Sequence, residues 1–151
     1  MNSRVWVGSV ELTHPVMAAS GTAGHGAELS AYGALDSIGA VVVKSIAATE
    51  WAGNPAPRVH PIAQGMINAV GLQGSGVNHW IENDLPAMAA VNATAVVSIW
   101  GRSVEEYRDA ARLLNEGLKR SSHQSTVVAV EVNLSCPNMH GHGIFAHDIA
   151  M

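Results

Sequence analysis

A single cysteine stands among polar residues at positions 131–138, in surroundings that suit acid–base chemistry. Cys136 follows the apolar run 127–130, which predicts a buried strand, so the thiol lies just past a strand end. A free thiol exchanges a proton near neutral pH when its surroundings favour the thiolate. The amides of Asn133 and Asn138 can donate and accept hydrogen bonds beside it. The pattern favours a cysteine that meets a ligand; a small buried hydrophobic side chain is the alternative.

Lysine and serine side chains follow other apolar runs in the same way. Lys44 terminates the predicted strand 40–45, where a charge must find a partner or remain at the mouth of the strand. We interpret Lys44 as a ligand-binding cation; the alternative is a side chain that buries its stem and keeps its ammonium group in water. Ser20 and Ser45 also follow strands, and ordinary turn roles explain them equally well.

A third candidate lies in a long excursion at residues 51–76, which contains three prolines and five glycines. Long loops in compact domains are usually functional. Within it, Gly65 and Gly71 of the segment 65–73 let the backbone approach a ligand, and Asn68 can bind an amide or carboxylate edge. An ordinary turn-rich connection is the alternative.

The elements that must position these residues alternate between strands and helices. A β-hairpin is expected at residues 5–12, and apolar strands are expected at 15–19, 40–45, 95–100 and 127–133. Helices are expected at 27–38, 77–91 and from 103 to about 119. Gly39 can end the first helix, Pro86 interrupts the second, and Ser103 with Glu106 has the spacing of a capping box before the third.

This alternation predicts an α/β fold with a parallel sheet and right-handed crossovers. Two architectures remain open, a doubly wound sheet and a (β/α)8 barrel. A barrel typically needs about 250 residues, and this chain supplies about four of the eight strand–helix units. In both architectures ligands bind at the carboxyl ends of the strands. We therefore expect Ser20, Lys44, Ser98 and Asn133 to lie near one another.

The composition narrows the class of protein. The chain has 151 residues, of which 48% are hydrophobic and 13% charged, with a formal net charge of −4. These values indicate a folded α/β domain, not a disordered chain. The sequence has no basic stripe for nucleic acid and no apolar stretch that could span a bilayer. It also lacks a signal peptide and a possible internal disulfide, as expected for a cytoplasmic protein.

Histidines raise the question of a metal site. His140, His142 and His147 follow Cys136, but no carboxylate or second cysteine completes a recognised zinc spacing. A glycine-flexible lid beside the cysteine is favoured over a metal site. Neither a Walker phosphate loop nor a Gly-x-Gly-x-x-Gly motif after the first strand is present.

Six segments, in the same order along the chain, resemble class 1 dihydroorotate dehydrogenase, the cytosolic FMN-dependent enzyme of pyrimidine synthesis. They are residues 16–22, 42–45, 53–59, 65–73, 98–102 and 131–138. The resemblance implies that residues 1–151 are the N-terminal half of a single FMN-binding (β/α)8 barrel domain, preceded by the β-hairpin. The excursion is similar to that of the branch that pairs with an iron–sulfur, FAD-containing subunit and passes electrons to NAD.

The resemblance also implies roles, residue by residue. Cys136 matches the base that takes a proton from dihydroorotate as hydride passes to FMN, and Lys44 matches the lysine that touches both. The implied flavin contacts are Ala19, Ser20, Gly21, Lys44, Ser45, Ser98 and Asn133. The implied substrate contacts are Lys44, Asn68, Ala69, Val70, Gly71, Leu72, Asn133 and Asn138. Many relatives have asparagine where this chain has Ser98, and the shorter side chain needs a water to reach the flavin.

Half a barrel leaves two sheet edges open, and the family's later strands carry another flavin-contacting lysine and the phosphate site. The resemblance therefore implies that the isolated chain is an inactive fragment of a cytoplasmic homo-oligomer. Two alternatives stay open: a related flavin dehydrogenase acting on dihydropyrimidines, and a non-catalytic half-barrel.

Overall fold

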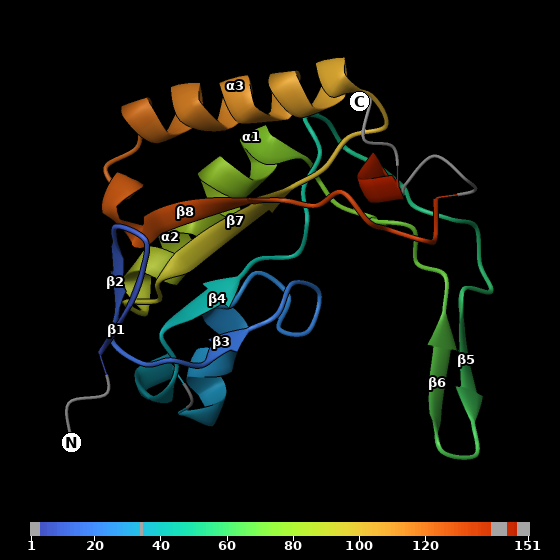
Figure 1. Ribbon diagram of the computed structural model, residues 1–151, viewed down its shortest axis with the longest axis horizontal. Helices are drawn as coiled ribbons and strands as arrows, with labels where there is room; N and C mark the ends of the chain where they lie inside the picture. The colour runs from blue at the N-terminus through green and yellow to red at the C-terminus, as the bar shows by residue number, and fades with distance from the viewer. Residues whose placement is uncertain (1–3, 34, 140–144, 148–151) are drawn as a thin grey trace.

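A four-stranded parallel sheet forms the centre of the computed structural model, which describes residues 4–33, 35–139 and 145–147 (Figure 1). Its strands are β3 (Met17–Ala18), β4 (Ala40–Val42), β7 (Ala95–Ile99) and β8 (Val127–Val132). The spatial order β3–β4–β7–β8 follows the order along the chain, and every pair is parallel. A doubly wound sheet reverses its order at a switch point, whereas a barrel does not. The strand order therefore favours the barrel.

The predicted β-hairpin is present as β1 (Val5–Val7) and β2 (Val10–Leu12), paired antiparallel. The chain leaving it passes against Gly39, immediately before β4. A Cβ at Gly39 would lie 2.2 Å from the carbonyl oxygen of His14, so this close approach requires glycine. Leu12 is buried at the same place. The hairpin is thus packed against the amino end of β4.

The prediction of one α-helix at residues 27–38 is wrong. The segment instead forms two short 3-10 helices, η1 (Ala27–Tyr32) and η2 (Leu35–Ser37). Neither contains a buried residue among those described, and η1 lacks a side-chain cap. Gly33, with φ of +66°, ends η1 in the left-handed region. Most helical stability comes from packing of an apolar face, and this segment has little of it.

The second predicted helix is confirmed with its interruption. It consists of α1 (Val77–His79), the π-helical segment η3 (Trp80–Asp84) and α2 (Leu85–Ala90). Pro86 has no N–H to donate to the carbonyl of Glu82, and Glu82 lies within the wider π turns that precede α2. Trp80, Leu85 and Met88 are almost completely buried against the strands.

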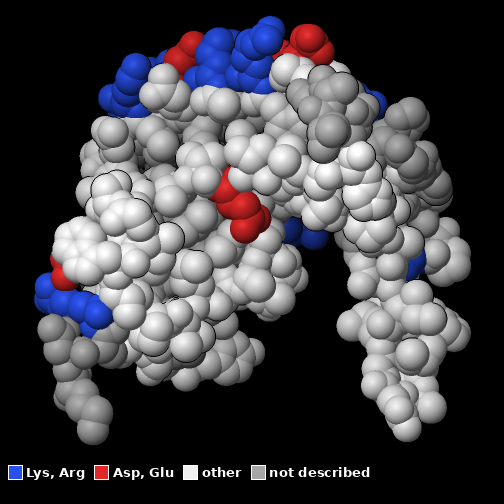
Figure 2. All heavy atoms as spheres, viewed as in Figure 1, with Lys and Arg blue, Asp and Glu red and all other residues white. Residues whose placement is uncertain are grey.

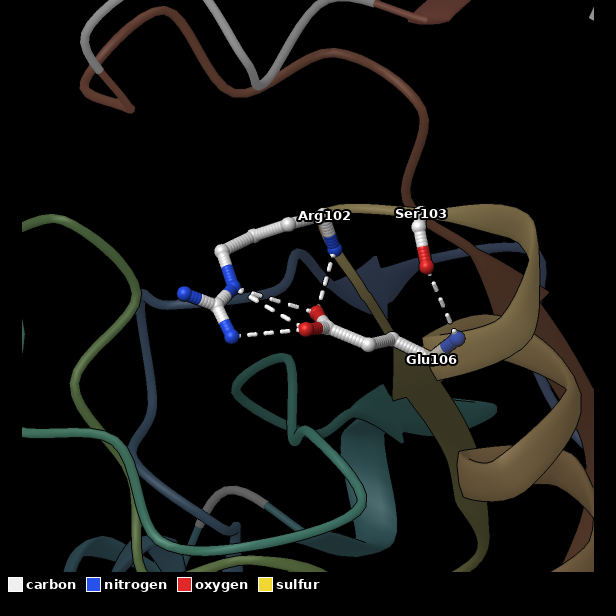
Figure 3. Close-up of polar contacts among 3 residues, drawn as sticks. All are labelled: Arg102, Ser103 and Glu106. Atoms are coloured by element: carbon white, nitrogen blue, oxygen red, sulfur yellow. Dashed lines mark hydrogen bonds and ion pairs between the residues drawn. The ribbon is translucent and has the colours of Figure 1, made fainter.

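The third helix, α3 (Val104–Arg120), runs alongside β7 and β8 (Figure 1). The hydroxyl of Ser103 accepts a hydrogen bond from the Glu106 N–H at 3.3 Å, as predicted. The Glu106 carboxylate, however, accepts from the N–H of Arg102 at 2.7 Å, one residue before the expected partner (Figure 3). The guanidinium of Arg102 also contacts this carboxylate, with Nη2 2.6 Å from Oε1 of Glu106. This hydrogen-bonded ion pair lowers the pKa of Glu106.

Residues 51–76 are not purely a loop. They contain an antiparallel hairpin, β5 (Val59–Ile62) and β6 (Gly65–Asn68), which projects from the body as an arm (Figure 1). All eight strand residues are exposed, so no apolar alternation marks them in the sequence. The surface of the arm is largely uncharged, whereas charged side chains gather along α3 (Figure 2).

The core lies between the sheet and the helices. Val41 and Val43 from the β4 region and Val97 and Ile99 from β7 all belong to one buried apolar cluster. Side chains alternate along a strand, so Ser98 faces the opposite side of the sheet. Within the described residues, no helix is long and apolar enough to cross a membrane.

Candidate functional site at the carboxyl edge of the sheet

Three hydroxyl groups form a line across the strands at their carboxyl ends. Ser20 donates to the Val43 carbonyl at 3.0 Å and lies 3.4 Å from the Ser45 oxygen. The Ser45 and Ser98 oxygens are 2.8 Å apart, and both residues are buried. Buried hydroxyls require partners, and Ser45 and Ser98 supply them to each other. The predicted convergence of Ser20, Ser45 and Ser98 is a feature of the structure.

The line continues to Glu131 on β8 and to Asn133, which directly follows β8. Ser98 donates to the Glu131 carboxylate at 2.6 Å, and the Asn133 amide nitrogen donates to the Ser45 hydroxyl at 3.0 Å. Residues two apart on a strand share a face, which places Glu131 and Asn133 side by side. Glu131 was not predicted as a site residue, although its spacing from Asn133 was a signal for it.

Asn133 is fixed at both its backbone and its side chain. Its N–H donates to the Ile99 carbonyl at 2.9 Å, and its own carbonyl accepts from the Tyr107 hydroxyl on α3. Its side-chain oxygen accepts from the Ser135 N–H at 3.2 Å. Tyr107 was also absent from the sequence predictions, since nothing in a helix pattern shows which strand end it reaches.

Cys136 is half-buried just beyond this network, and its thiol is free. Burial raises the pKa of the nearby Tyr107 hydroxyl, a hydrogen bond with the Gly101 backbone lowers it, and the charge of a Cys136 thiolate raises it. The Tyr107 ring also packs edge-to-face on Phe145, with centroids 5.6 Å apart. The cysteine therefore lies beside an aromatic pair at the end of β8. Among the described residues, no hydrogen bond connects its thiol to the serine line.

The predicted substrate loop at residues 68–72 is tied to the cysteine segment by Asn54. The Asn54 amide nitrogen donates to the Ala69 carbonyl at 2.8 Å and to the Asn138 carbonyl at 2.9 Å. The Trp51 indole donates to the Gly71 carbonyl at 2.9 Å. These contacts bring two segments with predicted substrate roles together. Neither Asn54 nor Trp51 was singled out in the sequence.

The remaining predicted contacts occupy accessible positions near the strand ends. Lys44 is half-buried, and no carboxylate of the described residues forms an ion pair with it. Ala19 accepts two hydrogen bonds from Thr22, which closes the turn after β3. Gly21 has φ of +79°, and a Cβ there would meet nothing within 4 Å. The backbone at Gly21 is thus open to a ligand.

Asn68 and Ala69 line a hollow of about 330 Å³ beside the arm, while Val70 and Leu72 continue the loop. Leu72 holds a φ of +58°, a conformation that is strained for a residue with a bulky side chain. The loop is therefore held in a shape that its own sequence does not favour.

The metal site considered from the sequence would involve the histidines that follow Cys136. No group of three or more His, Cys, Asp or Glu residues suited to a metal occurs among the residues that the structure describes. His140 and His142, and most of the predicted lid with them, lie outside those residues.

These features define half of a (β/α)8 barrel with a line of polar side chains at the carboxyl ends of its strands. Residues 3–151 match the family model for dihydroorotate dehydrogenase, and the chain belongs to this family. The resemblance seen in the six sequence segments is confirmed.

Similar bacterial proteins carry the name dihydroorotate dehydrogenase B (NAD(+)), catalytic subunit. The protein from Alkaliphilus metalliredigens is 41% identical over 144 residues, covering 95% of this chain and 45% of the relative. The protein from Geobacter metallireducens is 40% identical over 140 residues, covering 93% and 44%. This chain therefore spans less than half the length of these relatives.

A solved structure supports the fold. The crystal structure of DHODH from Eimeria tenella in complex with ferulenol superposes with a TM-score of 0.64 at 24% identity, covering 93% of this chain and 39% of that one. The predicted fold, the N-terminal half of a barrel with a β-hairpin, is confirmed.

Proposed function

We propose that residues 1–151 form the flavin- and substrate-facing N-terminal half of a single barrel domain that oxidises dihydroorotate to orotate in pyrimidine biosynthesis. The observation that carries this proposal is the continuous polar edge formed by Ser20, Ser45, Ser98 and Asn133. Membership of the dihydroorotate dehydrogenase family supports the reaction. Ligands of parallel α/β barrels bind at this edge.

The donor set fits a flavin ring. The ring edge alternates hydrogen-bond donors and acceptors, and the hydroxyls and amide at this edge offer both. The open backbone at Gly21 and the ammonium of Lys44 complete the proposed FMN contacts, together with Ala19. FMN, when bound, supplies the hydride acceptor that no side chain provides.

The chain's own residues supply a base, a cation and orientation. As a thiolate, Cys136 accepts the proton that leaves the substrate ring carbon, and the Sγ–H bond forms as that C–H bond breaks. Lys44 stabilises negative charge on flavin and substrate. Asn68, Asn133 and Asn138, with the backbone of residues 69–72, match the alternating donors and acceptors of the dihydroorotate ring. Analogues that lack these groups would leave buried polar atoms unpaired.

We further propose the setting of the complete enzyme. The relatives named as catalytic subunits point to a separate electron-transfer subunit, here an iron–sulfur, FAD-containing partner of a homo-oligomeric catalytic subunit. A cytoplasmic location fits a substrate of nucleotide synthesis.

The segment alone is proposed to be inactive. Val130 and Val132 on β8 are 48% and 52% exposed, and Met17 on β3, at the other edge, is 42% exposed. Exposed apolar edge strands invite pairing with other chains. This observation favours an incomplete barrel over a self-contained catalyst.

A chimera tests the proposal directly. Residues 1–151 are joined to the C-terminal part of the Alkaliphilus metalliredigens relative, and the purified protein is tested for bound FMN and for flavin reduction by dihydroorotate under anaerobic conditions. Bound FMN that dihydroorotate bleaches supports the proposal. A folded chimera that binds FMN but is reduced by dihydrouracil and not by dihydroorotate would favour the alternative dihydropyrimidine dehydrogenase.

A further inference from the structure

We propose that Glu131 is a positioning residue that fixes the orientation of the Asn133 amide through a directed chain of hydrogen bonds. The chain runs from Asn133 through Ser45 and Ser98 to Glu131, across three strands. Its consequence concerns ligand recognition: Asn133 is set as a hydrogen-bond donor. For the identity of that ligand, the inference rests on the proposed function.

The direction follows from counting hydrogens. An ionised carboxylate only accepts hydrogen bonds. Ser98 must therefore donate its single hydroxyl hydrogen to Glu131, whose Oε1 lies 2.6 Å from the Ser98 oxygen. The 2.8 Å contact between the Ser45 and Ser98 oxygens then requires Ser45 to be the donor. With its own hydrogen used, Ser45 presents lone pairs to Asn133. Only the amide nitrogen of Asn133 can complete that contact, at 3.0 Å.

Two neighbouring groups agree with this direction. The Ser20 hydrogen goes to the Val43 carbonyl at 3.0 Å, so Ser20 does not donate to Ser45, whose oxygen lies 3.4 Å away. The Asn133 side-chain oxygen accepts from the Ser135 N–H at 3.2 Å, which holds the oxygen away from Ser45. One amide hydrogen of Asn133 is used by Ser45, and the other remains. The group that meets Asn133 must therefore be an acceptor, such as a carbonyl or carboxylate oxygen.

Burial makes the direction persistent. Ser98 is 0% exposed and Ser45 is 2% exposed, so water does not reach either hydroxyl to supply an alternative donor or acceptor. Inverting the chain would leave the Ser98 oxygen and the Glu131 carboxylate oxygen 2.6 Å apart with no hydrogen between them. A carboxylate at the far end is the one group that sets the direction without ambiguity.

The test uses the FMN-loaded chimera with Glu131→Ala, Glu131→Gln, Ser98→Ala and the Ser98→Ala/Glu131→Ala double variant. The orotate dissociation constant is measured from the change in flavin absorbance. Glu131→Ala should weaken binding by about 5–20-fold, the usual range for one or two lost hydrogen bonds. Glu131→Gln should weaken it less, since its carbonyl still accepts from Ser98 without charge assistance. The double variant should bind no more weakly than Ser98→Ala.

A readout independent of ligand binding is the side-chain amide signal of Asn133 in protein labelled with ¹⁵N-asparagine, identified by its loss in Asn133→Ala. Glu131→Ala and Ser98→Ala should move this signal in the same direction. Glu116→Gln, on the exposed side of α3, is the control for charge removal and should leave it in place.

Two results would overturn the inference: multiplicative effects of Ser98→Ala and Glu131→Ala on orotate binding, or an Asn133 signal unmoved by Glu131→Ala. Failure of the parent chimera to bind orotate would refute the proposed function instead, and the amide signal of the ligand-free protein would still decide the role of Glu131. Should the alanine variant misfold, Glu131→Gln keeps the side-chain volume, and a smaller loss of orotate binding with a smaller shift of the Asn133 signal is then expected; no change in either would overturn the inference.

Discussion

Asn54 connects the loop at Ala69 with Asn138, which lies 84 residues further along the chain than Asn54, and removing its amide should loosen both segments. Its nitrogen uses both hydrogens, one on the Ala69 carbonyl at 2.8 Å and one on the Asn138 carbonyl at 2.9 Å. The amide also packs on Gly71, where a Cβ would lie 2.7 Å from the Asn54 Cγ. Asn54→Ala would leave both carbonyls to water.

The magnitude follows from these two bonds. Each is a neutral, partly exposed hydrogen bond with a net value of about 0.5–1.5 kcal/mol. The backbone bond from the Asn54 N–H to the Val70 carbonyl at 3.0 Å is retained in the variant. We therefore expect the lower part of the sum, about 1–2 kcal/mol, or orotate binding weaker by about 5–30-fold. Asn54→Asp has the same size but aims a carboxylate at two carbonyl oxygens, so it should bind more weakly still.

The assay is titration of the FMN-loaded chimera with orotate, combined with hydrogen exchange of the backbone amides at residues 69–71. Both variants should exchange faster there than the parent protein. Asn78→Asp, at an exposed position of α1, is the matched control and should change neither measurement. The reasoning is refuted if Asn54→Asp binds orotate as tightly as the parent, because the two carbonyls would then not be its partners.

Four further outcomes are expected. Cys136→Ala should keep FMN and orotate binding but slow flavin reduction by dihydroorotate about 10²–10⁴-fold in stopped-flow measurements; unchanged reduction would remove the thiol from the reaction. Lys44→Ala should weaken binding of both FMN and orotate, whereas a change in thermal stability alone would support the solvent-directed side chain. Glu106→Gln should lower stability in urea unfolding at neutral pH, and the difference should shrink as the pH falls below the ordinary range of a glutamate carboxyl and Glu106 is protonated, because its pKa is lowered in the folded state; a pH-independent difference would contradict the role of the Arg102 pair. The 151-residue chain alone should be oligomeric or poorly soluble and lack dehydrogenase activity, and a yellow, active monomer in gel filtration would overturn the half-barrel interpretation.

Sequence patterns predicted the structure correctly wherever it depends on residues within a single strand or helix. The apolar runs at 40–45 and 95–100 each contain a strand, because burial on both faces leaves a continuous hydrophobic signal. The apolar run at 127–133 also contains a strand, although none of the residues of β8 is fully buried. Ser103 caps α3 because capping depends on neighbours within one turn. The same patterns failed at residues 27–38 and in the exposed β5–β6 arm, where packing or pairing and not hydrophobic periodicity sets the structure.

By itself, the sequence determined that chemically capable residues follow the strands, since polar groups placed after apolar runs are visible in a single chain. Only the tertiary structure decided which of them meet. The bond between Ser45 and Ser98 joins residues 53 apart, and the bond between Asn133 and Ser45 joins residues 88 apart. Glu131 becomes a site residue only through the register that sets it beside Ser98. Strand order and register arise from the packing of all elements together, and no local pattern encodes them.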